Sequence, residues 1–503
     1  MANYVLKLGG NPVADPEYFD STIGLIKHII HEDSEAKIFL TTSALARGED
    51  RTTKSLEAMY RDNSNNLEQI TSIHIPLVGH YNLDFNTRSH FERELKGART
   101  LDEFEASGER VAGNLANKIL NSLGFSSEYI DPREIILTDS ISRNAKIAYV
   151  NEKTLLDSQA QIVVVPGYQG KDLSSGNTKT LGRSGTDYTG AALAVAVDAK
   201  FYAILKELES IYTADPRLVS SARRVPHLKY SEAIEEAISG MAATHPRAIK
   251  TCEESDMLLL VGSASDLLQN ATQITRERFV PSMPLVGITS RENYTVYSFE
   301  KEDKIYPYLD SLVAFSRQRI SVDMINTVNG GMSISVDWRN LKREIDFSKT
   351  KLLSQAESAL ISIVGSLGDS HTFASHLIEQ LKENQLPLPS QVYGAPSIPK
   401  GQTCLEFIDP EMHAKSGYTI ELHKELLWEA KIDLKGIATT VGRIFFFVDP
   451  KFKYRKVLAV ARQFGARINT YDGGSSLHST NVTFAFNPKH RKEVVNFLHN
   501  SLF

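Results

Sequence analysis

The chain is poor in three features that would each mark a class of protein: cysteine, long apolar runs and clusters of basic residues. Its two cysteines, Cys252 and Cys404, are far apart without CxxC spacing, so we expect no disulfide framework and no metal site. No window approaches about 18 uninterrupted apolar residues, and no membrane partner is expected. The opening residues lack a basic segment before an apolar core, which favours a cytoplasmic protein. With a net charge of −5, no nucleic-acid partner is expected either.

The composition is that of a folded protein that acts on, or senses, a small molecule. Hydrophobic residues make up 42% and charged residues 23% of the 503 positions. A chain of this length needs more than one core, and roughly two to four domains are expected. Short apolar strands alternate with helical patterns as far as Ala264, which predicts an α/β sandwich. The predicted strands are Tyr4–Leu8, Ile38–Thr41, Ile162–Val165, Phe201–Leu205 and Met257–Val261.

A glycine-containing loop leads into a helix within TLGRSGTDYTGAALAVAVDA, from Thr180 to Ala199. Small and apolar residues follow the loop at helical density, so a helix should begin close to Asp187. Free N–H groups and the dipole at a helix start attract carboxylates and phosphates. Arg183 adds a forked donor for a carboxylate and Asp187 can accept an ammonium group, so the loop suits an amino acid. The alternative is a plain connecting turn.

The first predicted strand carries Lys7 and is followed at once by Gly9 and Gly10. Glycines let the backbone approach a phosphate closely, and a neighbouring lysine neutralises part of its charge. An ordinary turn with a solvated lysine fits these residues equally well.

Two further polar residues stand at predicted element ends. Ser43 follows the second strand, at the edge where open α/β sheets bind ligands. Glu109 comes directly after Ser107 and Gly108, so we expect it in the first turn of a helix. There its carboxylate interacts favourably with the helix dipole, whether or not it also contacts a ligand.

The pattern changes after a polar stretch from Ser263 to Arg278. Three groups of elements follow, each in the order strand, helix, strand, strand, and their similarity indicates a repeated small α+β module. Such modules bury little apolar surface alone and usually pair through sheet edges or faces, so a homodimer or larger assembly is expected. The predicted ranges are a first domain at 1–275 and modules at 285–350, 357–430 and 436–503.

Several motifs in order make the chain resemble aspartate kinases of the amino acid kinase family over nearly its whole length. The quoted loop is the closest stretch, and the other motifs are KLGG at Lys7, SAL at Ser43, SGER at Ser107, YTADPR at Tyr212, HPRAI at His245 and GITS at Gly287. The resemblance implies an amino acid kinase-like three-layer α/β sandwich followed by ACT-like modules. In the family such modules bind end-product amino acids and hold the dimer together.

The resemblance also implies a reaction and its residues. The family transfers the γ-phosphoryl group of ATP, with Mg²⁺, to the side-chain carboxylate of aspartate, the first step of the aspartate-derived amino acid pathway. Lys7 and Asp187 match catalytic positions, and in the family Glu109 would contact the substrate's amino group. The matching substrate-binding residues are Ser43, Glu109, Arg183 and Asp187, and the matching nucleotide-binding residues are Gly9, Gly10, Glu207, Tyr212, Asp215 and Arg217.

The departures from the family pattern cluster on the nucleotide side. The usual KFGGTS reads KLGGNP, so Asn11 and Pro12 replace hydroxyl residues, and the proline also removes an N–H. The usual TDVDG reads KELES from Lys206, which keeps two acidic positions as glutamates. A lysine that meets ATP in the family corresponds to Ala242.

Three hypotheses follow. The chain is an active aspartate kinase with an adjusted nucleotide site, a kinase for another acidic amino acid or analogue, or a non-catalytic amino-acid-sensing homologue. The persistence of Lys7, the glycines and the whole substrate set favours a kinase. The four departures, at Asn11, Pro12, Lys206 and Ala242, favour the sensor.

Overall fold

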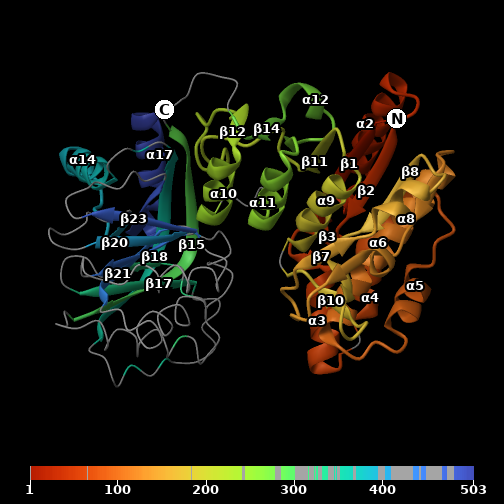
Figure 1. The fold of residues 1–503 in the computed structure, drawn as a ribbon, viewed down its shortest axis with the longest axis horizontal. Coiled ribbons are helices and arrows are strands. Elements are labelled where there is room, and N and C mark those ends of the chain that lie inside the picture. The colour runs from red at the N-terminus through yellow and green to blue at the C-terminus, as the bar shows by residue number, and fades with distance from the viewer. Residues whose placement is uncertain are drawn as a thin grey trace. The chain divides into compact units, whose positions relative to one another are not determined.

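A computed structural model describes most of the chain (Figure 1). Arg183 and Ala242 lie outside the described residues. The described residues are 2–64, 66–182, 184–240, 244–277, 285–300, 315, 322, 324–326, 331–337, 345, 347, 352–365, 367, 370–394, 403–408, 434–440, 443–448, 467–472 and 481–503.

The chain divides into two compact units. The first contains Met1–Ile211, Arg224–Tyr230 and Ala242–Val280. The second contains Tyr212–Arg223, Ser231–Met241 and Pro281–Phe503. The division differs from the predicted first domain at 1–275, because two internal segments belong to the second unit.

A large, mostly parallel sheet forms the centre of the first unit. Its described strands run in the order β12, β14, β13, β11, β1, β2, β8, β5. Only the β13–β14 pair among them is antiparallel. The order reverses at β1, because β2 and β8 lie on one side of it and β11 and β13 on the other. The bounds are β1 (Asn3–Leu8), β2 (Lys37–Thr42), β5 (Ser127–Tyr129), β8 (Ile162–Pro166), β11 (Phe201–Leu205), β12 (His227–Lys229), β13 (Leu259–Gly262) and β14 (Thr272–Thr275).

Helices cover both faces of this sheet, which confirms the predicted three-layer α/β sandwich. On one face Leu6 and Leu40 pack against Phe19 and Ile26 of α2 (Pro16–Glu32) and against Leu115 of α6 (Leu101–Ser122). On the other face α9 (Gly185–Ala196) contacts β1 and β11 and lies beside α11 (Pro246–Ser255), as Figure 1 shows. Since strand side chains alternate between faces, Lys7 points toward the α9 face while Leu6 and Leu8 point toward α2.

Two smaller sheets and a helical region complete the first unit. One sheet has the order β10 (Thr178–Thr180), β9 (Gln169–Asp172), β6 (Ile136–Thr138), β7 (Ile147–Val150), and the other pairs β3 (Ala46–Arg47) with β4 (Asp50–Arg51). A capping box between Thr100 and Glu103 starts the long α6. The helices not yet given are α1 (Gly10–Ala14), α3 (Thr52–Asp62), α4 (Leu67–His80), α5 (Thr87–Leu95), α7 (Pro132–Ile135), α8 (Glu152–Asp157) and α12 (Leu267–Asn270).

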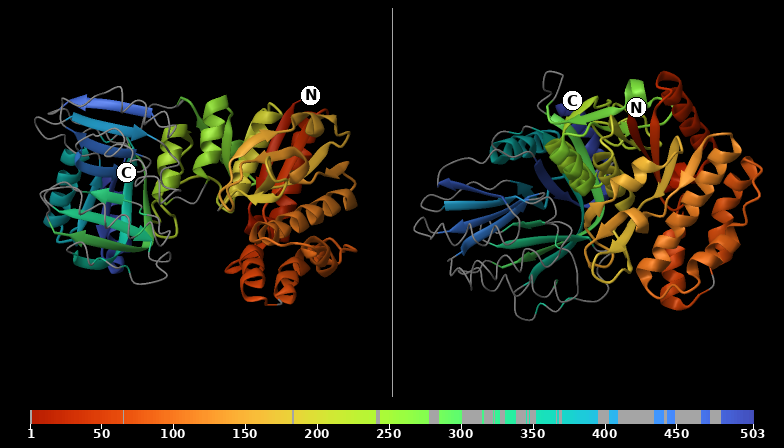
Figure 2. Two further views of the ribbon diagram at one scale, coloured as in Figure 1. Left: turned by 60° about the horizontal axis from the view of Figure 1, so that its bottom comes forward. Right: turned by 45° about the vertical axis from the view of Figure 1, so that its right-hand side comes forward.

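The second unit is built on a ten-stranded sheet within its described residues. Its order is β19, β24, β18, β15, β17, β16, β21, β22, β20, β23, and its strands can be followed by colour in Figure 2. The bounds are β15 (Leu285–Phe299), β16 (Met324–Asn326), β17 (Met332–Asp337), β18 (Leu352–Gly365), β19 (Gln391–Gly394), β20 (Thr403–Ile408), β21 (Leu434–Thr440), β22 (Arg443–Val448), β23 (Arg467–Asp472) and β24 (Asn481–Phe486).

The pairing in this sheet differs from three modules in series. β24, from the predicted third module, lies between β18 and β19 of the predicted second. β20, also from the predicted second, pairs instead with β22 and β23. The strands of these two modules are therefore interleaved, and the module boundaries themselves stay a prediction.

Helices of the second unit cover one face of β18 and β24. Leu377 of α14 (Ser370–Glu383) and Val494 of α17 (Arg491–Leu502) pack with Ile361 and Phe484 of these strands. The helix α10 (Tyr230–Ser239) falls mostly in this unit, where Thr289 Oγ1 donates to its Ser239 carbonyl at 2.7 Å. In the part of the chain that the structure describes, every helix is too short or too polar to span a membrane.

Candidate active site

Lys7 and Asp187 form a buried ion pair at the centre of the first unit. The distance from Lys7 Nζ to Asp187 Oδ1 is 2.6 Å. Lys7 is 5% exposed and Asp187 is 2% exposed. The pair lies near the carboxyl ends of β1 and its neighbour β11, where the strand order reverses. Ligands of open parallel sheets bind at such a reversal.

The first turn of α9 holds Asp187 in place. Asp187 is the third residue of this helix, close to the predicted start. Its Oδ2 accepts a hydrogen bond from the backbone N–H of His245 at 3.2 Å, and its carbonyl accepts one from the hydroxyl of Tyr202 at 2.9 Å. Burial raises the pKa of Asp187, but the charge of Lys7, with a smaller contribution from Lys206, lowers it below its ordinary value. Asp187 is therefore a carboxylate at neutral pH.

Glu109 lies inside α6 and not in a first turn, so the predicted start of this helix was wrong. The helix begins eight positions earlier, at Leu101. Gly108 stands within the helix for a packing reason: a Cβ there would lie 2.9 Å from Thr52 Cγ2 and 3.1 Å from Ala44 Cβ. A glycine that suggested a helix boundary instead lets the loop after β2 approach α6 closely.

The Glu109 side chain is 4% exposed, and its Oε2 has no hydrogen-bond partner among the described residues. Burial raises the pKa of Glu109 to about 8, although a hydrogen bond from the Ala44 backbone and the charge of Lys7 oppose this rise. The group is thus mostly a neutral acid at pH 7 and has an oxygen available for a ligand.

The glycine turn after β1 forms the short helix α1. Gly9 precedes this helix, and a Cβ on Gly10 would lie 2.7 Å from the Ala44 carbonyl oxygen, so the turn tolerates no side chain there. Pro12 is the third residue of α1, where its missing N–H removes no helical hydrogen bond. Ser43 is partly buried beside this turn, and its N–H donates to the Leu8 carbonyl at 3.1 Å.

Lys206 follows β11 directly and adds a second lysine to the centre. Its N–H donates to the Gly262 carbonyl at 2.8 Å, which continues the β11–β13 ladder by one residue. Burial lowers the pKa of Lys206, and the charge of Lys7 lowers it further, while Asp187 and Glu207 oppose the decrease. The three groups Lys7, Asp187 and Lys206 therefore interact electrostatically.

Helix α6 also positions the loop that leads into α9. Asp102 Oδ1 accepts hydrogen bonds from the N–H of Thr180 at 2.8 Å and from its hydroxyl at 2.6 Å. The same carboxylate accepts a hydrogen bond from the N–H of Arg143 at 3.1 Å. One helix thus carries both Glu109 and the anchor of the loop before Asp187.

The other predicted residues are not placed at this centre by the described structure. Arg183 lies outside the described residues. Glu207 is exposed, and its neighbour in the predicted set, Tyr212, belongs to the second unit together with Asp215 and Arg217. There Arg217 pairs with Asp215 at 2.9 Å. Their nucleotide-binding role stays a prediction.

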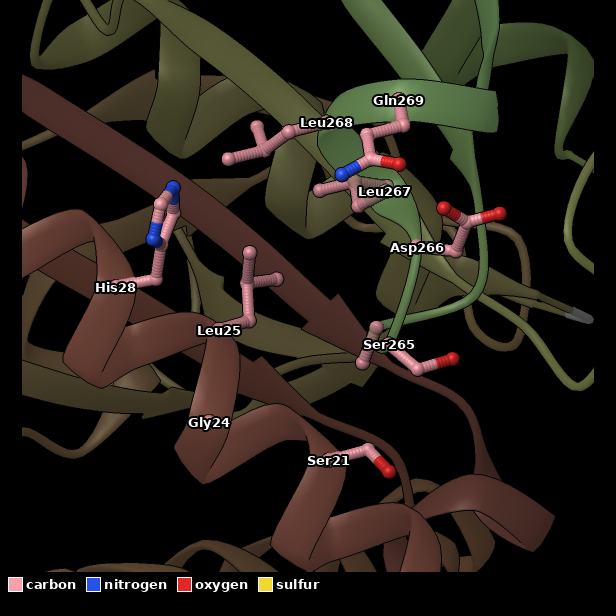
Figure 3. A pocket seen from close by; sticks show the side chains of 10 residues that line it. Ser21, Gly24, Leu25, His28, Ser265, Asp266, Leu267, Leu268 and Gln269 are labelled. Carbon is pink, nitrogen blue, oxygen red and sulfur yellow. The ribbon is translucent and has the colours of Figure 1, made fainter.

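A pocket of about 350 Å³ lies elsewhere in the first unit, between α2 and α12. Figure 3 shows Ser21, Leu25 and His28 on α2 facing the segment of Ser265 and Leu268. Its lining contains none of the predicted site residues, so it is separate from the ion pair.

Sequence reasoning missed two contributors to the centre. The backbone N–H of His245 contacts Asp187, and nothing in a sequence motif predicts which main-chain group does so. Thr41 is the register partner of Lys7, and its buried Oγ1 has no hydrogen-bond partner among the described residues. Its position at a predicted strand end was the available signal.

The arrangement suits chemistry on an anionic ligand that carries an ammonium group. A buried lysine can neutralise a phosphoryl group in transfer, and such transfers depend chiefly on positioning and charge stabilisation. A carboxyl group with a free oxygen can accept a hydrogen bond from an ammonium group.

Comparison with known proteins agrees with this chemistry. Residues 4–263 match the amino acid kinase family. The lysine-sensitive aspartokinase 3 of Escherichia coli is 28% identical over 271 residues, which cover 52% of this chain and 60% of that protein. The chloroplastic aspartokinase 2 of Arabidopsis thaliana is 26% identical over 439 residues, 78% of this chain and 80% of that protein. The resemblance to aspartate kinases is thereby confirmed.

Solved structures share the fold over almost the full length. The E. coli aspartokinase III in complex with aspartate and ADP has a TM-score of 0.64 at 21% identity and covers 99% of both chains. The Clostridium acetobutylicum aspartate kinase has a TM-score of 0.61 at 18% identity and covers 99% of this chain and 100% of that one. Because the matched segment spans half of the sequence and includes Lys7, Glu109 and Asp187, the chain belongs to the amino acid kinase family.

Proposed function

We propose that this protein phosphorylates the side-chain carboxylate of L-aspartate with ATP, giving 4-phospho-L-aspartate and ADP. The observation that carries the proposal is the buried Lys7–Asp187 pair, with Glu109 electrostatically coupled to Lys7. Two lines of comparison support it: the curated relatives are named aspartokinases, and the E. coli structure with aspartate and ADP has the same fold.

In the proposed reaction each group has one task. Lys7 stabilises charge on the γ-phosphoryl group while its bond to the leaving ADP oxygen breaks and a bond to the aspartate carboxylate oxygen forms. Asp187 holds the Lys7 ammonium group in position, since their ion pair is short and buried. Glu109 accepts the substrate's ammonium group through its free oxygen. Gly9 and Gly10 let the backbone approach the phosphates, and Ser43 lines the site of transfer.

The remaining roles follow the family pattern. Arg183 would bind the α-carboxylate, and Glu207, Tyr212, Asp215 and Arg217 would hold the nucleotide. No group of three or more His, Cys, Asp or Glu side chains that could hold a metal occurs among the described residues. We therefore propose that Mg²⁺ arrives with ATP, because Mg²⁺ retains waters and is commonly held by substrate phosphates with few protein carboxylates.

Assembly and location are also proposals. A homodimer or larger assembly through the ACT-like modules is supported by the two ends of the ten-stranded sheet, β19 and β23, which pair on one side only among the described strands, since such sheet edges favour association. A cytoplasmic location stays a prediction of the sequence.

The experiment that tests the function is trapping of the acyl phosphate as a hydroxamate. Purified protein with ATP, Mg²⁺ and aspartate should form the hydroxamate, and Lys7→Ala should abolish it. A panel with glutamate and other acidic amino acids tests the second hypothesis. If none of these substrates gives hydroxamate while calorimetry still detects aspartate binding, the protein is an amino-acid sensor and the kinase proposal fails.

A further inference from the structure

Strand geometry directs two lysines to the same place. Lys7 is the register partner of Ile204 in the parallel β1–β11 pair, and Lys206 lies two residues beyond Ile204. Side chains two apart on a strand share a face. Leu205 packs on the α2 face, so Lys206 points to the opposite face, as Lys7 does. The two lysines are therefore diagonal neighbours, at a separation that long side chains can bridge.

The backbone that carries Lys206 is held on both sides. Its N–H donates to Gly262 of β13 at 2.8 Å, and its carbonyl accepts a hydrogen bond from the hydroxyl of Tyr18 on α2. Burial raises the pKa of Tyr18 to about 12, so this hydroxyl stays a donor at all physiological pH values. A side chain on such an anchored strand end has a defined direction.

The charge balance of the centre calls for an anion. Lys7 is paired with Asp187, which is ionised. Lys206 interacts with the same carboxylate, and Glu109, with a pKa of about 8, is mostly neutral at pH 7. The two lysines thus share the Asp187 carboxylate, and burial and the charge of Lys7 both disfavour the ammonium form of Lys206, which Glu207 supports only in part. A phosphate group that enters there would favour the ammonium form of Lys206 and offset the repulsion between the two lysines.

We propose that Lys206 is a second phosphate-binding lysine, which contacts the γ-phosphoryl group of ATP from the β11 side while Lys7 contacts it from β1. The inference rests on the proposed kinase function and adds one catalytic residue to it. During transfer the bond between the γ-phosphorus and the ADP oxygen breaks, and a bond to the aspartate carboxylate forms. Lys206 keeps its proton throughout and acts only through charge and hydrogen bonding.

The test compares ATP with ADP, because only ATP has the γ-phosphoryl group. In Lys206→Met, the Kd for MgATP should rise roughly 10- to 100-fold, as expected for the loss of one charge-assisted hydrogen bond, and the Kd for MgADP should change less than about threefold. Lys206→Arg should restore most of the ATP affinity. The matched control is Lys200→Met, which removes the lysine at the other end of the same strand, over the Tyr4 ring, and should leave both constants unchanged.

Equal losses for ATP and ADP, or no loss for either, would overturn the assignment, and so would a wild-type protein that binds neither nucleotide. If Lys206 only neutralised the charge of Asp187, the ratio of the Kd values for MgATP and MgADP in Lys206→Met would equal that of the wild type. The hydroxamate assay on the wild type separates this outcome from failure of the proposed function. A protein that forms no acyl phosphate but discriminates ATP from ADP through Lys206 keeps the phosphate site and loses the kinase activity.

Discussion

The first turn of α9 and the middle of α6 each bring one carboxyl group into the neighbourhood of Lys7, and the two groups differ in charge although they are similarly buried. Asp187 is 2% exposed and Glu109 is 4% exposed. Lys7 lies 2.6 Å from Asp187 and holds its pKa low, whereas burial dominates at Glu109 and raises its pKa to about 8. The charges that act on each carboxyl group, and not the extent of burial, decide which one is ionised.

Pairs of titratable groups with separated pKa values commonly have different tasks in one site. In the proposed reaction the ionised Asp187 orients a cation that belongs to the protein. The neutral Glu109 binds the ammonium group of the substrate, and Glu109 loses its proton when the substrate binds.

The largest effect should come from removing the shared lysine. Lys7→Met leaves Asp187 buried without its closest cation, so the free energy of unfolding should fall by about 3–5 kcal/mol, and hydroxamate formation should be lost. Urea unfolding of the wild type and the variant at pH 7 measures the first quantity. If the free energy of unfolding fell by less than about 1 kcal/mol, Lys206 alone would be enough to stabilise the charge of Asp187. The difference in pKa between Asp187 and Glu109 would then not depend on Lys7.

A second effect follows from the raised pKa of Glu109. Between about pH 5 and 8 the folded state holds a proton on Glu109 that the unfolded state has released, so wild-type stability falls as pH rises through this window. Glu109→Gln removes the titrating group. The stability of the variant relative to the wild type should therefore increase by up to about 1.4 kcal/mol per pH unit.

Unfolding at pH 6, 7 and 8 measures this slope. Asp187→Asn serves as the contrasting case: because the pKa of Asp187 is lowered from 3.8, its contribution is lost only on strong acidification, and its difference from the wild type should stay constant between pH 6 and 8. A difference between Glu109→Gln and the wild type that stays constant with pH would show that Glu109 is ionised in the folded protein.

The smallest effect concerns the affinity for aspartate. Because the ammonium group favours the ionised form of Glu109, binding below pH 8 should release up to one proton, and the affinity should rise by at most about tenfold per pH unit. Calorimetry at pH 7 in buffers of different ionisation enthalpy counts the released protons. In Glu109→Gln no proton should be released; an unchanged count would assign the proton to another group.

Much of this centre could be predicted because it depends on local patterns. The strand with Lys7 and the glycines after it, and the start of a helix near Asp187, both appear where the sequence indicates. The position of Glu109 was harder to predict. In the sequence Gly108 suggests a helix boundary, whereas in the structure a glycine is needed there because Thr52 and Ala44 approach the helix closely. Contacts between distant segments of this kind leave no periodic signal.

The pairing of the strands in the second unit could not be predicted from the sequence either. The strand that became β24 was predicted, but its insertion between β18 and β19 depends on partners more than 80 positions away. Alternation of apolar residues marks a strand without marking its neighbour. Likewise, α12 and β14 lie in the polar stretch from Ser263 to Arg278. They were not predicted, because both elements are short and the segment is polar.

The central place of β1 has a consequence for how the protein is made. Its register partners are Lys37–Thr42 on one side and Phe201–Leu205 on the other. A nascent chain therefore exposes one long edge of its first strand until more than two hundred residues have left the ribosome, because that strand waits for β11. The ion pair has a similar constraint: Asp187 follows Lys7 by 180 positions, so the pair can form only after β2, β5 and β8 of the same sheet have been synthesised.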